Sequence, residues 1–227
     1  MTSPTVIFDL DGTLLSTSAD LMASLNHVLA HSGVAPVHYQ DMTWLVGQGA
    51  RVMIERAHVL RGHPAGESEL AGLMDMFIAH YGANMPGETV PFPGILAALD
   101  RLEADGMRLA VCTNKTESLA VKLLEGLGMA GRFAAITGGD TFAIRKPHGD
   151  HILRTIEMAG GSPRHAVMIG DSVNDILAGQ NANVPTIAVP FGYSDRPVEE
   201  FNPTVVIRHF DELDAGLIHR LIAAVDA

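Results

Sequence analysis

Short apolar runs alternate with longer amphipathic segments along most of this chain, and the alternation predicts an α/β fold. Apolar runs of strand length occupy residues 6–8, 109–112, 133–137, 166–169, 186–189 and 205–207. Between these runs, apolar residues recur at helical spacing, and they do so again from residue 211 to residue 225. Strands that alternate with helices favour a parallel sheet that is covered by helices on both faces.

One long segment interrupts the alternation, because residues 15–88 show helical spacing without a clear strand signal. Two of the expected helices carry apolar stripes, at Leu21, Leu25 and Val28 and at Leu70, Leu73 and Phe77. The sequence therefore predicts a Rossmann-like parallel-sheet core flanked by helices, formed by residues 1–14 and 89–227. An inserted all-helical cap domain is expected over residues 15–88.

Composition and charge indicate a folded globular protein and argue against some kinds of binding partner. The chain has 227 residues and 47% hydrophobic residues, enough for a substantial core. Its net charge of −11 argues against a nucleic-acid partner or an anionic membrane surface. We find no apolar run of membrane-spanning length and no secretory pattern, so a cytoplasmic protein is expected, with its oligomeric state left open. The single cysteine, Cys112, excludes an internal disulfide and is expected to be a buried apolar residue.

Candidate chemistry lies where the predicted strands end. Asp9 and Asp11 follow the first strand, and side chains two residues apart in a strand face the same side. Two such carboxylates repel each other unless a cation or hydrogen bonds intervene. Asp171 follows a later strand and Thr113 ends another. Because ligands bind beyond the carboxyl ends of parallel strands, these groups are expected to converge there.

Four short motifs, at residues 9–13, 113–114, 146–147 and 170–175, resemble the ordered motifs of the haloacid dehalogenase superfamily. They span nearly the whole chain in the usual order. Further stretches, at residues 43–50, 91–94, 138–140 and 145–148, look like those of the bacterial phosphoglycolate phosphatases. Two positions depart from the family pattern: Ser16 stands where an acidic residue is common, and Gly149 where proline is common.

The resemblance implies a set of catalytic and metal-binding roles. It makes Asp9 the nucleophile that forms an aspartyl-phosphate and Asp11 the general acid and base. It also implies a Mg²⁺ ion held by Asp9, Asp171 and the backbone carbonyl of Asp11. Asp175 is expected to support the metal or to orient Lys146 from outside the ligand set, and Ser172 to help hold the site.

Other residues are expected to bind the phosphoryl group. The Thr113 hydroxyl and the backbone N–H of Asn114 are candidate donors to phosphate oxygens. Lys146 is one of only three lysines, and its compact ammonium group fits between a phosphate oxygen and a carboxylate. Lys115 is a weaker candidate, since it lies near the site in sequence but could equally face water.

The cap loop is a candidate specificity element. The residues at issue are Gly47, Gln48, Gly49 and Arg51. They could contact a small carboxylate, or the glycines could only make a tight turn while the arginine faces solvent; the sequence leaves both open. Trp44 is expected to anchor the cap or to line the substrate entrance. His148 and His151 are expected on a helix surface, since no further ligands suggest zinc.

The expected function is that of a Mg²⁺-dependent phosphomonoesterase that hydrolyses 2-phosphoglycolate to glycolate and phosphate. Its partner is then a small phosphorylated metabolite. One alternative is a phosphatase or phosphomutase of the same superfamily that acts on a small sugar phosphate. A second alternative is a receiver-type phosphoacceptor module, which also groups acids, a Thr and a Lys around an aspartate but would not need the helical insertion.

Overall fold

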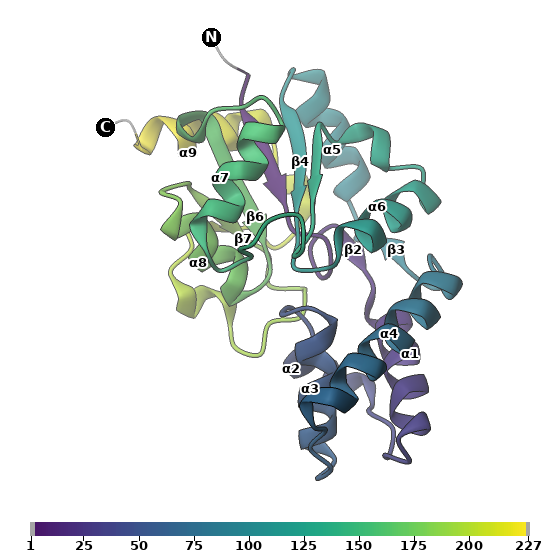
Figure 1. The fold of residues 1–227 in the computed structure, drawn as a ribbon. Helices are drawn as coiled ribbons and strands as arrows, with labels where there is room; N and C mark the ends of the chain where they lie inside the picture. The colour runs from purple at the N-terminus through teal and green to yellow at the C-terminus, as the bar shows by residue number, and fades with distance from the viewer. Residues whose placement is uncertain (1–2, 226–227) are drawn as a thin grey trace.

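A six-stranded sheet forms the centre of the computed structural model, which describes residues 3–225 (Figure 1). The strand order is β5-β4-β1-β6-β7-β8, and every neighbouring pair is parallel. The strands are β1 (Thr5–Phe8), β4 (Arg108–Cys112), β5 (Ala135–Thr137), β6 (Ala166–Gly170), β7 (Thr186–Ala188) and β8 (Val205–Val206). The predicted α/β class with a parallel sheet is confirmed.

Helices cover both faces of this sheet because its central strands are apolar on both sides. Val6 and Phe8 pack with α5 (Ile95–Ala104), α6 (Glu117–Gly126) and α9 (Ala215–Val225). Ile7 points the other way and packs with α7 (Gly149–Met158) and α8 (Val173–Asn181). The four residues of β1 are fully buried, as expected for a strand between two helical layers.

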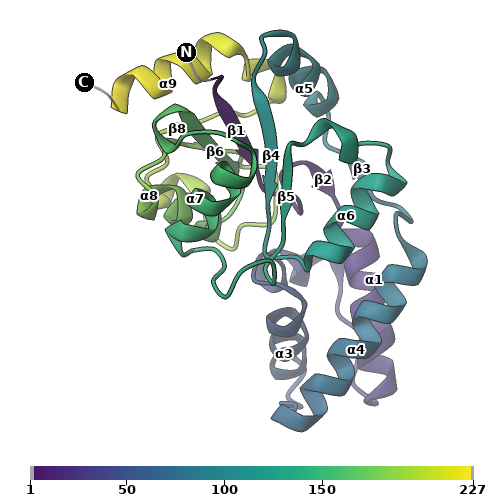
Figure 2. The same cartoon turned by 45° about the horizontal axis from the view of Figure 1, so that its top comes forward.

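The helical segment forms a cap with a hydrophobic cluster of its own. Its helices are α1 (Ser18–His31), α2 (Met42–Leu45), α3 (Ala50–Leu60) and α4 (Glu67–Asn84). They lie beyond one end of the sheet, below it in Figures 1 and 2. The two connections to the core pair as short antiparallel strands, β2 (Leu15–Ser16) and β3 (Val90–Pro91). The boundaries 15 and 88 stay predictions.

Several elements are shorter than their sequence patterns indicate. The strand expected from residue 133 begins at Ala135, after the 3₁₀ turn η2 (Ala130–Arg132). The last helix begins at Ala215 rather than at 211, since the 3₁₀ turn η5 (Phe210–Glu212) precedes it and Asp214 accepts a hydrogen bond from the N–H of Leu217. The remaining 3₁₀ turns are η1 (Tyr39–Asp41), η3 (Pro163–His165) and η4 (Val198–Phe201).

The burial of His151 differs from the sequence-based expectation, and the position of Trp44 decides between two alternatives. His151 is fully buried on α7, with its ring edge-on to Phe142, so its predicted surface position is wrong, whereas His148 is exposed. Burial lowers the pKa of His151 to about 3. Trp44 is 40% exposed and stacks under the guanidinium of Arg56 rather than lining the cavity described below.

Two findings bear on other parts of the sequence analysis. Cys112 is fully buried in β4, as predicted, and burial raises the pKa of its thiol to about 11. Within residues 3–225, none of the helices has both the length and the apolar character needed to cross a lipid bilayer.

Candidate active site

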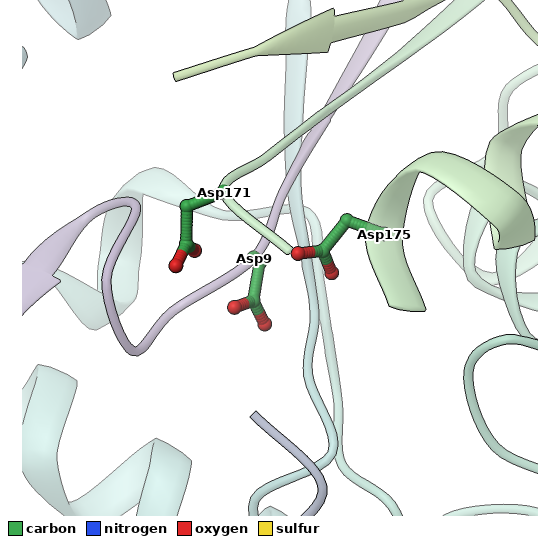
Figure 3. Close-up of side chains that lie close together, drawn as sticks. All are labelled: Asp9, Asp171 and Asp175. Atoms are coloured by element: carbon green, nitrogen blue, oxygen red, sulfur yellow. The ribbon is translucent and has the colours of Figure 1, made fainter. Parts of the chain in front are cut away.

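Three neighbouring strands deliver the acidic and phosphate-binding candidates to one edge of the sheet. Asp9 follows β1, Asp171 follows β6, and Thr113 follows β4, which all end at the same edge because they are parallel. Figure 3 shows the carboxylates of Asp9, Asp171 and Asp175 grouped there. One carboxylate oxygen from each lies within 4.8 Å of the others, and all three residues are buried. The first and the last of the four motifs thus meet at this edge, as predicted.

Lys146 is the cation at the centre of this group. Its ammonium group donates to Asp9 Oδ1 at 2.7 Å, to Asp175 Oδ1 at 2.6 Å and to the Cys112 carbonyl at 2.6 Å. These three acceptors use all the N–H donors of an ammonium group. Burial alone would lower the pKa of Lys146, but the carboxylates of Asp175 and Asp9 outweigh burial and raise that pKa. Lys146 therefore holds Asp9 in place in this structure and is fully engaged in doing so.

Asp175 is held from its other side by the start of α8. Its Oδ2 accepts from the backbone N–H of Ser172 at 3.0 Å and from the Ser172 hydroxyl at 2.7 Å. This is a capping box, in which the first residue and the third helical residue satisfy each other's backbone groups. Both oxygens of Asp175 thus have donors, and one of these donors is the cationic Lys146 ammonium group, so Asp175 is less available to a metal ion than Asp171, whose donors are uncharged.

Asp171 is held by hydrogen bonds from Thr13 and Tyr193, to which the sequence analysis gave no role. Its Oδ1 accepts from the Thr13 hydroxyl and its Oδ2 from the Tyr193 N–H, each at 2.7 Å. Gly12 and Gly192 pack against the same carboxylate, and a Cβ on either would lie 2.4 Å or 2.3 Å from Asp171 Oδ2. Thr13 lies inside the first motif, and Tyr193 follows β7, whose end also faces this edge; that placement is the only sequence signal for it.

The donor set fits a divalent cation. Burial, followed by repulsion from Asp175 and Asp11, outweighs the attraction of Lys146 and raises the pKa of Asp9 from 3.8 to about 7. Burial and the charges of Asp175 and Asp9 raise the pKa of Asp171 as well. Asp9 Oδ2 accepts no hydrogen bond from residues 3–225. A hard cation prefers carboxylate oxygens of this kind and would relieve the repulsion, so Asp9 and Asp171 are the best-placed side chains to hold one.

The loop after β4 supplies uncharged donors. The Thr113 hydroxyl oxygen accepts from the Lys115 N–H at 3.2 Å, and its own hydrogen has no acceptor within the described residues. The Asn114 amide donates to the carbonyls of Lys146 and Gly47, at 3.1 Å and 3.3 Å. The structure therefore brings Thr113 and Asn114 to the same cavity as Asp9.

The cap loop reaches the core through one backbone carbonyl. Gly47 O accepts from Asn114 and also from Asn174, the latter at 3.2 Å. Gly47 and Gly49 line the cavity, both with positive φ, and a Cβ on Gly49 would lie 3.1 Å from the Asn114 carbonyl. The loop is therefore a tight turn held against the core.

Two candidate specificity residues lie away from the cavity. Arg51 pairs with Glu67 at 2.6 Å on the cap surface, and 43% of its side chain is exposed. Gln48 lines a different hollow, next to Asn174 and Tyr193. The structure thus gives Arg51 the solvent-facing position that was one of the two expected alternatives.

The two departures from the family pattern lie in different parts of the molecule, and the structure explains the one at residue 149. Ser16 lies in β2 and pairs with Val90 of β3, in the connection between cap and core. Gly149 opens α7 against the end of α8, where a Cβ would lie 2.6 Å from the Asn181 carbonyl group. The space at residue 149 is therefore too narrow for a side chain.

Lys115 faces Asp11 rather than water. Its ammonium group contacts the Asp11 oxygens at 2.9 Å and 3.1 Å, and only 5% of its side chain is exposed. It also lies 4.4 Å from the ring centroid of Tyr81, a cap residue that the sequence analysis did not single out. Tyr81 continues the apolar stripe of α4, so from sequence it resembles an ordinary core residue.

A small cavity of about 40 Å³ lies between cap and core at this point. Asp9, Asp11, Thr113, Lys115 and Tyr81 all line it. One water molecule needs about 10–15 Å³ by this measure, so the cavity has room for only a small ligand.

Comparisons with known proteins agree with this geometry. The family described as haloacid dehalogenase-like hydrolase matches residues 6–189. A phosphoglycolate phosphatase of Agrobacterium fabrum is 58% identical over 97% of this chain and 95% of its own length. One of Mesorhizobium japonicum is 47% identical over 99% of both chains. The crystal structure of a predicted phosphoglycolate phosphatase from Haemophilus somnus superposes with a TM-score of 0.87 at 27% identity, covering 93% of this chain and 96% of that one.

The match covers the first strand, the cap and the strands that carry Thr113 and Asp171. The two phosphoglycolate phosphatases named above match this chain over nearly their whole length, and such enzymes are phosphoric monoester hydrolases. This chain is an enzyme of that reaction class, and it belongs to the haloacid dehalogenase-like hydrolases.

Proposed function

We propose that this enzyme hydrolyses 2-phosphoglycolate to glycolate and inorganic phosphate, with Mg²⁺ as its metal and a phosphorylated aspartate as the intermediate. One observation carries the chemistry: a buried carboxylate, Asp9, keeps one oxygen without a hydrogen-bond donor among the described residues and lines a cavity together with Thr113. The names of the relatives support the substrate. The size of the cavity supports it too, since 2-phosphoglycolate is a small ester.

In the first step, Asp9 Oδ2 attacks phosphorus and forms a new P–O bond in line with the ester bond. The ester P–O bond breaks, and its electron pair leaves with the glycolate oxygen, which takes a proton from Asp11. A bound Mg²⁺ ion, held by Asp9, Asp171 and the backbone carbonyl of Asp11, would neutralise charge on the phosphoryl oxygens.

In the second step, a water molecule attacks the same phosphorus. Asp11, now deprotonated, accepts a proton from that water, the P–O bond to Asp9 breaks, and phosphate leaves. Asp9 and Asp11 return to their starting states. The closed cap keeps bulk water away from the intermediate, since Gly47 and Gly49 sit directly against the β4 loop.

The remaining residues bind or position. Thr113 donates its hydroxyl and Asn114 its backbone N–H to phosphoryl oxygens. Lys146 keeps Asp9 oriented and adds positive charge next to the phosphoryl group, and Asp175 with Ser172 keeps Lys146 oriented. A cytoplasmic location and the absence of nucleic-acid partners stay predictions from the sequence.

A phosphate-release screen tests the proposal. The purified enzyme is given small phosphomonoesters, including 2-phosphoglycolate and sugar phosphates, with Mg²⁺ and with chelator. The highest kcat/KM is expected for 2-phosphoglycolate, with activity lost in chelator. Equal or higher values for sugar phosphates would replace the substrate and leave the reaction class in place. Conversion of a sugar phosphate without phosphate release would indicate a mutase instead.

A further inference from the structure

The core lysine Lys115 and the cap tyrosine Tyr81 meet in the active-site cavity, where the steps above give neither of them a role. We propose that together they bind the carboxylate of the substrate, so that the enzyme selects small phosphate esters that carry a second anionic group. The inference rests on the proposed function, because it assigns a substrate-selecting subsite to the same cavity.

The first support is the position of the lysine charge. The Lys115 ammonium lies at the cavity wall, with both oxygens of Asp11 on one side and the Tyr81 ring on another. An ammonium group has three N–H donors, and within the described residues the two Asp11 oxygens accept from it with hydrogen-bond geometry, while the Tyr81 hydroxyl also interacts with it. At least one N–H is thus available to an anion in the cavity.

The second support is an unpaired hydroxyl. Tyr81 is 1% exposed, and its hydroxyl oxygen is buried with no hydrogen-bond partner within residues 3–225. A buried hydroxyl without a partner is costly, and such groups in folded proteins usually have one. A ligand oxygen that occupies the cavity would be that partner, and the Tyr81 O–H would donate to it.

The third support is the rest of the cavity wall. The cap contributes apolar side chains there, among them Leu21, Met53 and Phe77. An uncharged polar group on the substrate would find few partners among them, whereas a carboxylate would find Lys115 and Tyr81. Apolar surroundings also strengthen the attraction between an ammonium group and a carboxylate.

The cap arginine is excluded from this role by its position. Arg51 is paired with Glu67 on the outer surface of the cap and does not line the cavity. Among the described residues that line the cavity, Lys115 is the only lysine or arginine.

The test compares pairs of esters that differ in one carboxylate. One pair is 2-phosphoglycolate and ethyl phosphate, and the other is 3-phosphoglycerate and glycerol 3-phosphate. For each pair, the preference is the ratio of the two kcat/KM values. Tyr81→Phe keeps the ring beside Lys115 and removes only the hydroxyl. It is expected to lower the preference about 10- to 100-fold, mainly by raising KM for the carboxylated ester.

Lys115→Met is expected to lower the preference by at least about tenfold, whatever it does to both rates through Asp11. Matched controls are Lys122→Met, which removes an exposed lysine of α6 that donates to the Gly82 carbonyl in the cap, and Tyr39→Phe, a change of an exposed tyrosine in the cap. Both controls are expected to keep the wild-type preference. Thermal melting verifies that each variant is folded.

The outcomes separate this inference from the proposed function. If 3-phosphoglycerate is a better wild-type substrate than 2-phosphoglycolate, and both variants lose the preference for the carboxylated member of each pair, the subsite stands and the proposed substrate is wrong. If the wild type prefers 2-phosphoglycolate and Tyr81→Phe keeps the full preference, the subsite is wrong. Equal losses on both members of a pair in Lys115→Met would show that Lys115 acts only through Asp11. A wild type without preference for carboxylated esters would overturn both.

Discussion

Replacing Asp9 by asparagine is expected to stabilise the metal-free protein while removing its activity. Burial holds the pKa of Asp9 near 7 instead of 3.8, so the folded state disfavours the ionised carboxylate. Asparagine resembles the neutral form and is free of this cost. Because the pKa of Asp9 is higher in the folded state than in the unfolded chain, protonation of Asp9 stabilises the fold. This stabilisation is complete below pH 3.8 and is lost as the pH rises through about 7.

The size of the effect follows from the pKa difference. Each pKa unit corresponds to about 1.4 kcal/mol, so the gain from Asp9→Asn is expected to reach about 4 kcal/mol at pH 8. At pH 5 the folded carboxyl is neutral and only the unfolded chain is ionised, which leaves a gain of about 2 kcal/mol. Urea denaturation of both proteins in chelator, at pH 5 and at pH 8, measures the two differences.

Magnesium provides the internal control for this experiment. Binding of Mg²⁺ to the folded wild type is expected to restore stability at pH 8, whereas the asparagine variant is expected to gain much less. Asp105→Asn, at an exposed aspartate, is the matched control and is expected to change stability little at either pH. An Asp9→Asn variant that is less stable than the wild type at pH 8 would refute the reasoning about the buried carboxylates.

Three further variants test the contacts around the site. Lys146→Met leaves Asp9 and Asp175 buried without their cation. Urea denaturation in chelator at pH 8 is expected to show a free energy of unfolding lower by about 3–5 kcal/mol. An unchanged urea midpoint would contradict the stabilising role of these ion pairs. Gly12→Ala places a Cβ against Asp171 at a φ of +93°. We expect this change to weaken Mg²⁺ binding and to lower the free energy of unfolding by about 1–3 kcal/mol. Mg²⁺ titration curves identical to those of the wild type would argue against this geometry. Tyr193→Phe removes the hydroxyl that accepts from two backbone N–H groups at the start of α1. The free energy of unfolding, measured by thermal or urea denaturation, is expected to fall by about 1–3 kcal/mol. An unchanged free energy of unfolding would mean that water replaces the hydroxyl.

The sequence could predict the convergence of the motifs because parallel strands end at one edge. Asp9, Thr113 and Asp171 each follow a buried apolar run, so their meeting depends only on strands being parallel and adjacent. Asp175 and Lys146 were also recognisable, since one opens a helix next to an acidic strand end and the other is one of three lysines. The roles assigned to these residues stay predictions that the experiments above test.

Contacts between cap and core could not be read from the sequence, because they depend on how the cap is placed over the sheet. Tyr81 continues a stripe that any buried helix would carry, and only the closed cap brings it to Lys115. Arg51 lies in the first turn of α3, where a small rotation of the helix decides between cavity and solvent. His151 looked like a surface residue because histidine is polar, yet it shares the buried face of α7 with Ile152 and Thr155.

Chemical trapping of the intermediate tests the central mechanism most directly. Enzyme turning over 2-phosphoglycolate with Mg²⁺ is quenched in acid and reduced with borohydride, which converts an aspartyl-phosphate to homoserine. Peptide mass spectrometry is expected to find homoserine at position 9, and only when both substrate and metal are present. Continued phosphate release with reduction at another aspartate, or with none, would contradict the assignment of Asp9 as the nucleophile.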